Sequence, residues 1–589
     1  MLNRRSICTF VVALFIMSSF AFCDSLKDDW GDFLHYTKIG RFDLAKGYAQ
    51  KIIDSKPDPK ELLKLSEENE VGYKILLKMY ADSDELRQVA GGIIDIIEDG
   101  RYLRRTDPKI IIQEIKRLST NIKGRIAAEQ RLKNAGEYAI SFMLDALADR
   151  DRKEEFAYII GALPKIGKDA IRPLVAALQT DDVAVKPEIV RALGEIGYSQ
   201  ALGYLKYIIE NDKNAGLKEL ATQAINKIDP SAMKIPSAEL FFITGQTYYY
   251  HKASLAPQPG DFANIWFWDA KENKLTRHQV GQAYFYEMMA MRSCEWALRA
   301  DENIGKAIAL WIAAFFKAES SGLEQPTYFA AGHADALTYA MTAGPEYLHQ
   351  ALDRALTDKN AHVALWSVEA LAANAGQKSL LYTFGTQQPL VKALSFDDTA
   401  VRYSAAIAIA SANPDLKFIG SKLIIENLAK AIVKENAVEA LGDELAQVYA
   451  MRAVDILLQL AITRNELIDL SQARGELVKV TKANWEQMQI SAGQVLAHLE
   501  SPDAQRAIAS MAVTESNSLQ VRIEAFSSLA VSAKKNSSML EGEMIDAIYA
   551  IVASDDVDPD LRAEAASAFG AMNLPSIKVK DLILDQSKS

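Results

Sequence analysis

The chain contains few of the residues that interrupt regular secondary structure. Its 589 residues include only 30 glycines and 17 prolines. Alanine, the residue that helices accommodate best, is abundant throughout. This composition favours an all-α protein and argues against an all-β fold.

Cysteine is also scarce, with 3 residues at Cys8, Cys23 and Cys294. Removal of a leader that ends at Cys23 would leave Cys294 alone. Without a disulfide framework, a chain of this length must be stabilised by its hydrophobic core. Cys294 lies close in sequence to Met291 and Trp296, so we expect a buried apolar side chain, with a reactive thiol as the alternative.

Positive charge does not dominate the composition. The formal net charge is -11, which argues against a protein that holds nucleic acid through its phosphates, so no nucleic-acid partner is expected. Hydrophobic residues make up 49% and charged residues 24% of the chain. These fractions exclude a disordered chain and fit the burial of a large apolar surface.

The motifs that carry common enzyme chemistry are missing. The sequence has no H-E-x-x-H, no G-x-S-x-G, no paired C-x-x-C and no G-x-G-x-x-G between a strand and a helix. Residues 161–169 differ from a phosphate-binding loop in glycine spacing and in having Asp169 where Ser or Thr is needed. His333 and Asp335 are the nearest approach to a metal-ligand pair. We therefore predict no catalytic residue, cofactor or metal, and an enzyme is the least favoured class.

The N-terminus has the order of a secretory signal. Arg4 and Arg5 precede an apolar run from Ile7 to Phe22, and small residues follow before Asp24. Cleavage after Ala21 or after Cys23 would release a soluble chain. A lipid-modified Cys23 is the rival interpretation, although bulky Phe22 occupies a position where a small residue is expected.

Residues 1–23 therefore predict export to the periplasm or the extracellular space. No other stretch approaches 18 consecutive apolar residues, so we expect no transmembrane helix in the mature chain.

One pattern recurs along the chain: a capping residue is followed by residues of defined type at +3, +4, +7, +10 and +11. In the clearest copy these positions are Asp398, Val401, Arg402, Ala405, Ala408 and Ile409. Further copies begin at Asp182, Asn214, Asn360, Ser518 and Asp558, and looser copies begin at Asp443 and Trp485. The first residue suits a helix N-cap, and the apolar residues share one helical face. The residue at +4 is expected at the edge of that face, where it could pair with an acidic residue of the next repeat.

The spacing of adjacent copies runs from 32 residues (Asp182 to Asn214) to 45 residues (Asp398 to Asp443). Two antiparallel helices and a turn fit this length, which is the unit of a helical solenoid. The capped stripe resembles HEAT repeats, over residues 130–228 and 330–575. This resemblance implies an α-solenoid of helical hairpins that binds other proteins.

The N-terminal residues show a different pattern. Between Trp30 and Pro57, residues such as Gly40, Ala45 and Ala49 follow the spacing of a tetratricopeptide repeat. The resulting domain prediction is a signal peptide (1–23), a helical cap (24–100), HEAT-like repeats (101–235), an aromatic-rich β insert (236–285) and further HEAT-like repeats (286–589).

Aromatic residues concentrate in the insert, where nine of the 28 residues from Phe241 to Trp268 are aromatic. Tyr248 to Tyr250 and Ile265 to Trp268 are predicted as β structure, with a turn at 269–273 and a second strand from Leu275 to Val280. The aromatic side chains would either pack as a wedge in the solenoid or form an exposed binding platform, with a glycan as ligand. The candidate residues are Tyr248, Tyr249, Tyr250, Trp266 and Trp268. A helix from Tyr284 to Trp311 is expected to follow.

Basic residues concentrate between Arg101 and Lys133, with ten basic and three acidic residues. This local charge of +7 leaves -18 on the rest of the chain. The segment is either a solvated helix face or a docking surface for an acidic partner or an anionic lipid. The acidic partner could be the region around Asp555, Asp556, Asp558 and Asp560 of a second copy, so self-association is possible. The candidate residues are Arg101, Arg104, Arg105, Lys116 and Arg117.

The whole layout resembles exported bacterial HEAT-repeat proteins. It predicts a non-catalytic exported scaffold that mediates protein–protein interaction, with a partner that the sequence does not identify. The alternative is a glycan-binding or enzyme-accessory protein with its site at the aromatic insert.

Overall fold

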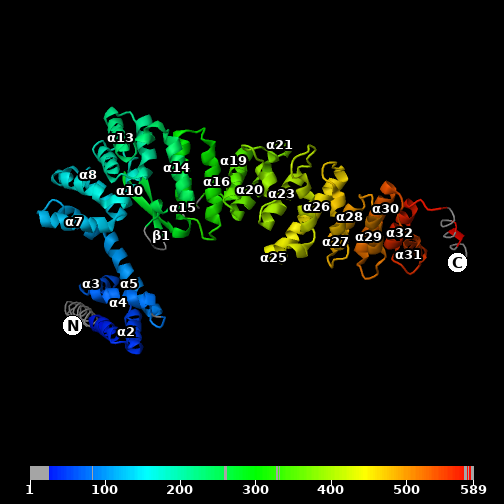
Figure 1. Cartoon of the computed structure of the whole chain (residues 1–589), viewed down its shortest axis with the longest axis horizontal. Helices are drawn as coiled ribbons and strands as arrows, with labels where there is room; N and C mark the ends of the chain where they lie inside the picture. The colour runs from blue at the N-terminus through cyan, green and yellow to red at the C-terminus, as the bar shows by residue number, and fades with distance from the viewer. Residues whose placement is uncertain are drawn as a thin grey trace, which may run out of the picture. The chain divides into compact units, whose positions relative to one another are not determined.

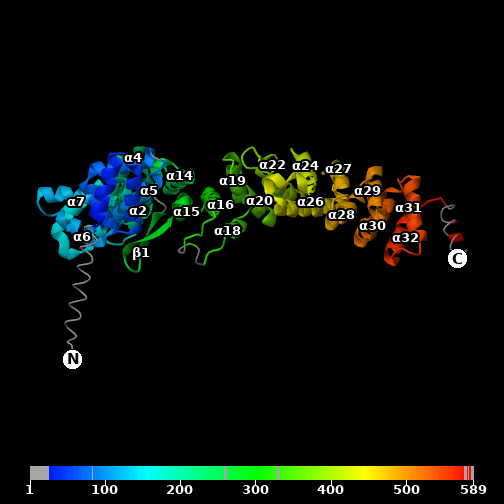
Figure 2. The ribbon, with the colours of Figure 1, turned by 90° about the horizontal axis from the view of Figure 1, so that it is seen from below.

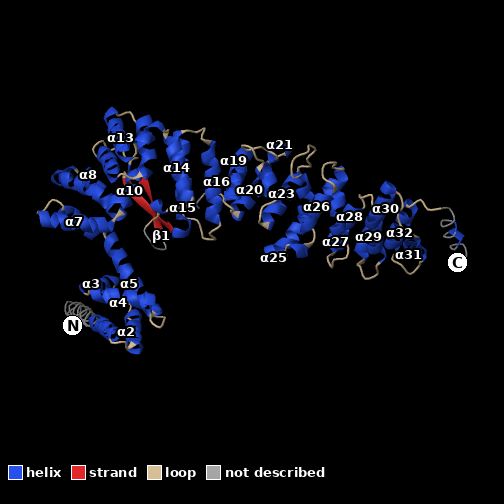
Figure 3. Cartoon of the chain, in the orientation of Figure 1, coloured by secondary structure: helices blue, strands red, loops and turns tan. Residues whose placement is uncertain are grey.

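The computed structural model describes residues 25–82, 84–257, 262–326 and 332–575, together with residues 329, 580, 583 and 584. The proposed signal, Cys8 and Cys23 lie outside these residues. The described chain is helical apart from one two-stranded sheet (Figure 3), so the predicted all-α solenoid with a small β-hairpin is confirmed. Two compact units divide it. Unit 1 comprises the chain up to Leu240 with Asn264–His278, and unit 2 comprises Phe241–Ala263 with the chain from Gln279 onward.

Unit 1 begins with the helices drawn in blue in Figure 1. They share a small core of their own. They are residues 25–38, α2 (Phe42–Asp54), α3 (Pro59–Glu68), α4 (Glu70–Asp82) and α5 (Arg87–Thr106). Gly40 has a φ of 75°, a left-handed value that glycine adopts readily, and it ends the turn before α2. The rings of Tyr36 and Tyr48 then stack at 5.5 Å across the two helices. This helical hairpin stands where the tetratricopeptide pattern was found, and the repeat type stays a prediction.

The repeats of unit 1 follow and share a second core. They are α6 (Pro108–Arg117), α7 (Ile122–Ala135), α8 (Glu137–Ala148), α9 (Phe156–Ala162), α10 (Ile171–Ala177), α11 (Val185–Ile196), α12 (Leu202–Asn211) and α13 (Ala215–Ile228). A 3₁₀ segment, η2 (Leu163–Ala170), joins α9 to α10. It contains residues 163–169 of the segment compared with a phosphate-binding loop, whose first two residues lie in α9, and it uses Leu163, Ile166 and Ala170 as core residues.

The insert contains less β structure than its aromatic content suggested. β1 (Phe262–Asp269) and β2 (Lys274–Gly281) form the predicted hairpin, and the Asp269 side chain accepts hydrogen bonds from two backbone N–H groups in its turn. The prediction of β structure at Tyr248 to Tyr250 is wrong, because α14 (Ser237–Tyr249) extends through Tyr249. Burial of its aromatic side chains against neighbouring helices outweighs their intrinsic preference for strands.

Unit 2 continues with helical repeats. They are α15 (Gln282–Ala300), α16 (Gly305–Glu319), α18 (Ala336–Ala343), α19 (Pro345–Thr357), α20 (Ala361–Asn374), α21 (Gln377–Leu380), α22 (Pro389–Ala393), α23 (Thr399–Ser411), α24 (Ser421–Ala431), α25 (Val438–Leu441), α26 (Asp443–Thr463), α27 (Arg474–Val480), α28 (Glu486–Leu496), α29 (Pro502–Val513), α30 (Leu519–Asn536), α31 (Gly542–Ala553) and α32 (Pro559–Ala571). The single helix expected from Tyr284 to Trp311 is wrong, because a turn at 301–304 separates α15 from α16. The Asp301 side chain accepts a hydrogen bond from the Asn303 N–H in that turn.

One helix in the described residues, α26, is long and apolar enough to span a membrane. Its apolar side chains are used inside unit 2, where Tyr449, Val454 and Leu457 are buried. It packs against α23, α24 and α28. Since core helices of soluble proteins have the same properties, α26 is weak evidence for a membrane span.

The repeat pattern is borne out at its capping positions. In the six clearer copies, from Asp182 to Asp558, the first side chain accepts a hydrogen bond from the backbone N–H at +3, at 3.0 to 3.4 Å. Five of these residues are the N-caps of their helices, whereas Asp182 stands two residues before Ala184, the N-cap of α11. The looser copies at Asp443 and Trp485 begin helices without such a bond. In all eight copies the residues at +3, +7, +10 and +11 are buried.

The residue at +4 has a role that was only partly anticipated. Lys186 does pair with an acidic residue before the next repeat, Asp212, at 3.2 Å. In other copies the side chain turns back towards the chain before its own helix. Arg402 and Arg562 donate to backbone carbonyls of the preceding loop, and Arg522 donates to the Ala512 carbonyl in the last turn of α29. These bonds satisfy carbonyl groups at the end of the preceding helix or in the loop that follows it.

Candidate functional site

The tryptophans of the hairpin are anchoring residues inside unit 1. Trp266 is buried, and its ring N–H donates to Glu137 on α8 at 2.7 Å. Asn264 donates to the other carboxylate oxygen at 2.6 Å, and Arg172 on α10 completes the cluster at 3.3 Å. Trp268 is half-buried and packs against the same core. The hairpin is therefore fastened to α8 by a buried carboxylate.

The three tyrosines lie in a second polar cluster, within unit 2. Tyr248 and Tyr249 are buried, whereas Tyr250 is 45% exposed. The hydroxyl of Tyr250 accepts from Arg354 at 2.9 Å and donates to Asp358 at 3.3 Å. Burial raises the pKa of both Tyr249 and Tyr250.

The prediction of an exposed stacking face at the insert is therefore wrong for Tyr248, Tyr249 and Trp266. Their large apolar rings contribute to the cores around them, which leaves no free ring face for a sugar. The alternative, in which the aromatic side chains pack as a wedge, fits these three residues. Among the five candidates, Tyr250 alone is exposed.

A buried carboxylate, Glu287 on α15, organises the neighbourhood of Tyr249. It lies 2.5 Å from His251 and 3.2 Å from Lys317 on α16, and Lys317 also donates to the Tyr249 carbonyl at 2.8 Å. Burial by itself raises the pKa of Glu287, but the hydrogen bond from His251 and the positive charges nearby hold it below its usual value. These bonds join the C-terminal end of α14 to the next two helices.

The arginines of the basic segment are largely neutralised. Arg104 forms a bidentate pair with Glu67 on α3 at 2.7 and 2.8 Å, which lowers the pKa of Glu67. Arg101 bonds Glu98 and lies over the Tyr73 ring at 4.6 Å.

The remaining arginines of the segment are also engaged. Arg105 lies over the rings of Tyr102 and Tyr138, each at 5.5 Å. Arg117 and Arg131 share the buried carboxylate of Glu114 at 3.1 and 2.5 Å. Lys116, by contrast, is exposed, and its side chain makes neither an ion pair nor a ring contact within the described chain.

Two further exposed lysines, Lys123 and Lys133, lie on α7. Asn121 caps this helix by accepting from the Gly124 N–H at 2.8 Å. Ala128, Leu132 and Ala135 face the core, and α7 packs against α6, α8 and η2. Figure 2 shows α7 next to α6.

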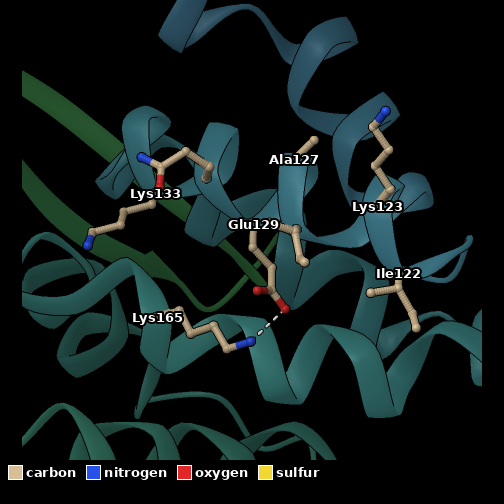
Figure 4. Close-up of a pocket in the computed structure, with 8 residues that line it drawn as sticks. Ile122, Lys123, Ala127, Glu129, Lys133 and Lys165 are labelled. Carbon is tan, nitrogen blue, oxygen red and sulfur yellow. Dashed lines mark hydrogen bonds and ion pairs between the residues drawn. The ribbon is translucent and has the colours of Figure 1, made fainter.

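The opposite face of α7 lines an open groove of about 970 Å³, here named the α7 groove. Its lining residues are Ile122, Lys123, Ile126, Ala127, Glu129, Gln130, Lys133 and Lys165. Figure 4 shows Lys165 of η2 reaching Glu129 across the groove, at 2.6 Å. Ile122 is 73% and Ile126 is 62% exposed.

Sequence reasoning had counted Lys123 and Lys133 within the basic segment but had not singled out this helix. The available signal was the pair of isoleucines, four residues apart, on a helix with a separate apolar stripe. Without the packing of α7, the sequence does not tell which of its two stripes is buried.

No group of three metal-ligating side chains is found among the described residues. Asp335 caps α18 by accepting from the Thr338 N–H, while His333 stacks on Phe329. Cys294 is fully buried, as expected, and burial raises the pKa of its thiol.

Comparison with known proteins supports the repeat assignment. Residues 140–226, from α8 to α13, match the family described as HEAT repeats. This segment contains the copies that begin at Asp182 and Asn214. No curated protein matches the sequence.

Solved structures resemble the chain only distantly. Importin beta is 12% identical, over 94% of this chain and 71% of that one, with a TM-score of 0.27. A homology model of the AP-3 complex is 12% identical, over 97% and 84%, with a TM-score of 0.25. An engineered protein is 15% identical, over 88% and 99%, with a TM-score of 0.18. Similarity at this level carries no argument about function.

Proposed function

We propose that this HEAT-repeat protein is an exported, non-catalytic scaffold that binds other proteins through the solvent-facing side of its helical repeats. The observation that carries the proposal is the α7 groove. Two isoleucines there are mostly exposed, although the helix already buries another apolar stripe. Apolar side chains exposed together in a concave surface are typical of binding sites for other macromolecules.

The buried carboxylates of the chain support the non-catalytic part of the proposal, because they are engaged in contacts between elements. Glu137, Glu114 and Glu287 each bond side chains from neighbouring helices or from the hairpin. These carboxylates therefore stabilise the packing between elements. Export is supported by the secretory pattern of residues 1–23.

Site-specific photo-cross-linking in the native host tests the binding function. A photoreactive amino acid at position 126 should cross-link a discrete protein, which mass spectrometry identifies. The same amino acid at position 419 serves as the control, because Ile419 is 92% exposed and lies outside the groove. A scan of solvent-facing positions in both units that yields no cross-linked protein would contradict the proposal.

Export has a separate test. N-terminal sequencing of the protein purified from its host should find Phe22 or Asp24 as the first residue. A chain that keeps Met1 and stays in the cytoplasmic fraction would contradict export and leave the binding function unaffected.

A further inference from the structure

The α7 groove combines apolar and basic groups in an ordered row. Ile122, Ile126, Gln130 and Lys133 follow one another at intervals of three or four residues and so lie along one side of the helix. From residue 122 to residue 133 the helix rises by about 16 Å. This length matches roughly three turns of a second helix laid along α7.

The charge of the groove is positive. Among the residues of α7, Lys123, Arg125, Arg131 and Lys133 are basic and Glu129 alone is acidic. Lys165 neutralises Glu129 at 2.6 Å, whereas Lys123 and Lys133 are exposed and form no ion pair in the described part of the chain. Two lysines thus stand beside two exposed isoleucines without a carboxylate to pair with.

We propose that the α7 groove binds an acidic amphipathic helix of a partner protein. This inference rests on the proposed scaffold function and specifies its partner. The apolar face of the partner helix covers Ile122 and Ile126, and its Asp or Glu side chains face Lys123 and Lys133. Apolar contact supplies the affinity, while charge complementarity selects acidic partners over basic ones.

The shape of the surface favours a protein segment over a membrane. An interfacial membrane helix inserts a protruding apolar face into the lipid, whereas Ile122 and Ile126 line a groove that also contains the carboxylate of Glu129. A protein helix can lie along such an open groove with its apolar side chains against the two isoleucines.

The acidic C-terminal repeat of a second copy fits the groove less well. Asp555 already pairs with Arg562 at 3.0 Å, and Asp558 accepts the N–H groups at the start of α32. Two of the four carboxylates in that cluster are therefore engaged within their own chain.

The test uses two fluorescent peptides with the same helical leucine spacing, one carrying glutamates and the other lysines at the flanking positions. Fluorescence anisotropy with the full-length mature protein should show binding of the acidic peptide, weakened by added salt, and no binding of the basic peptide. No binding of the acidic peptide, or equal binding of both, overturns the proposal.

Two double variants examine the two components of recognition. Ile122→Ser with Ile126→Ser should weaken binding of the acidic peptide by about tenfold or more, because the apolar contact is lost. Lys123→Glu with Lys133→Glu should weaken it by a similar factor and allow the basic peptide to bind. All four side chains are exposed, so these variants keep their fold, which circular dichroism checks.

The matched control is Lys417→Glu with Ile419→Ser, since both side chains are exposed on a loop of unit 2. It should bind the acidic peptide with the affinity of the unmodified protein. Equal loss in the control and in the groove variants overturns the assignment to α7.

Two further measurements distinguish the proposed partner helix from two other occupants of the groove, a membrane and a second copy of the chain. Flotation with phosphatidylglycerol vesicles that depends on Ile126, without peptide binding, would assign the groove to a membrane and overturn the proposal. Concentration-dependent dimers that disappear in the groove variants, again without peptide binding, would assign it to a second copy. If position 126 cross-links a protein in the host but the acidic peptide does not bind, this inference fails and the scaffold function stands.

Discussion

Buried ionisable residues are the positions at which single side chains matter most in this protein. Glu137 and His349 show two ways of burying a polar group. The carboxylate of Glu137 is surrounded by donors from the hairpin and from α10. His349 is fully buried, and one ring nitrogen donates to the Ser379 carbonyl at 2.7 Å while the other, Nδ1, has no partner within the described residues. A buried polar or charged group that is left without a partner at either site lowers the stability of the fold.

Glu137→Ala should destabilise unit 1 by about 3–5 kcal/mol, because it leaves Arg172 and the donors of Asn264 and Trp266 without their acceptor. Hydrogen exchange should rise in the hairpin, from Phe262 to Gly281, and the urea midpoint should fall. Glu188→Ala removes a more exposed pair with Arg191 and should change stability by at most about 1 kcal/mol. Equal effects of the two substitutions would contradict the anchoring role of Glu137.

The burial of His349 predicts that the stability of unit 2 depends on pH. Burial lowers the pKa of His349 below its usual 6.5, so the unfolded chain takes up a proton before the folded chain does. The stability from neutral His349 is complete above pH 6.5 and is lost as the pH falls below it, with a slope of up to about 1.4 kcal/mol per pH unit. His349→Gln keeps a donor for Ser379 without titrating. Denaturation curves between pH 7.5 and pH 5 should therefore show a smaller pH dependence in this variant, and an unchanged dependence would refute the prediction.

Helices in this protein are placed by their caps and by how closely they approach one another. Asp398 shows the capping role, since its carboxylate accepts the Val401 N–H at 3.0 Å and sets the start of α23. Gly194 shows the approach of two helices. A Cβ atom at this position would lie 2.7 Å from the Ala224 Cβ and 2.9 Å from the Ala224 Cα.

Gly194→Ala should therefore destabilise unit 1 by about 1–3 kcal/mol, because α11 and α13 must move apart. This cost outweighs the gain of up to about 1 kcal/mol that alanine brings inside a helix. Gly161→Ala on α9 is the control, since nothing lies within 4 Å of the added atom. Thermal unfolding should show a lower midpoint for the first variant and an equal or higher one for the second. Stabilisation by both would mean that α11 and α13 are not in such close contact.

Sequence patterns anticipated some elements and not others. The six clearer copies were found because the first residue and its stripe lie within twelve residues of one another. The end of α14 was mistaken for β structure because Tyr248 and Tyr249 favour strands in isolation, whereas burial against other helices decided their conformation. The break between α15 and α16 was missed because apolar residues continue at helical spacing on both sides of it.

On the scale of the whole molecule, each helix contacts mainly its neighbours in sequence. α30, for example, packs against α28, α29 and α32. Polar bonds follow the same order, as Glu369 on α20 bonds Ser404 on α23 and Arg452 on α26. In such an array, stability is a sum of units and of the interfaces between adjacent units.

A cavity in one repeat should consequently loosen only the repeats around it. Phe526 on α30 is fully buried, and Phe526→Ala should cost about 3–5 kcal/mol. Hydrogen exchange of the full-length protein should rise from α28 to α32 and stay unchanged from α15 to α20. Val531→Ala on the same helix is the control, because Val531 is 41% exposed. Faster exchange throughout unit 2 would contradict a stability that is local to neighbouring repeats.

The sequence by itself determined the all-α class, the frame of the repeats and the faces that they bury. These follow from interactions within one helix, namely the capping hydrogen bond and the 3.6-residue period. Only the tertiary structure decided which charges and rings remain accessible. Arg104 meets Glu67 from 37 residues away, and Trp266 meets Glu137 from 129 residues away. Such pairs form between segments that are distant in sequence. Local spacing therefore did not indicate that Arg104 and Trp266 would be engaged inside the protein, or that the lysines and isoleucines of α7 would stay exposed.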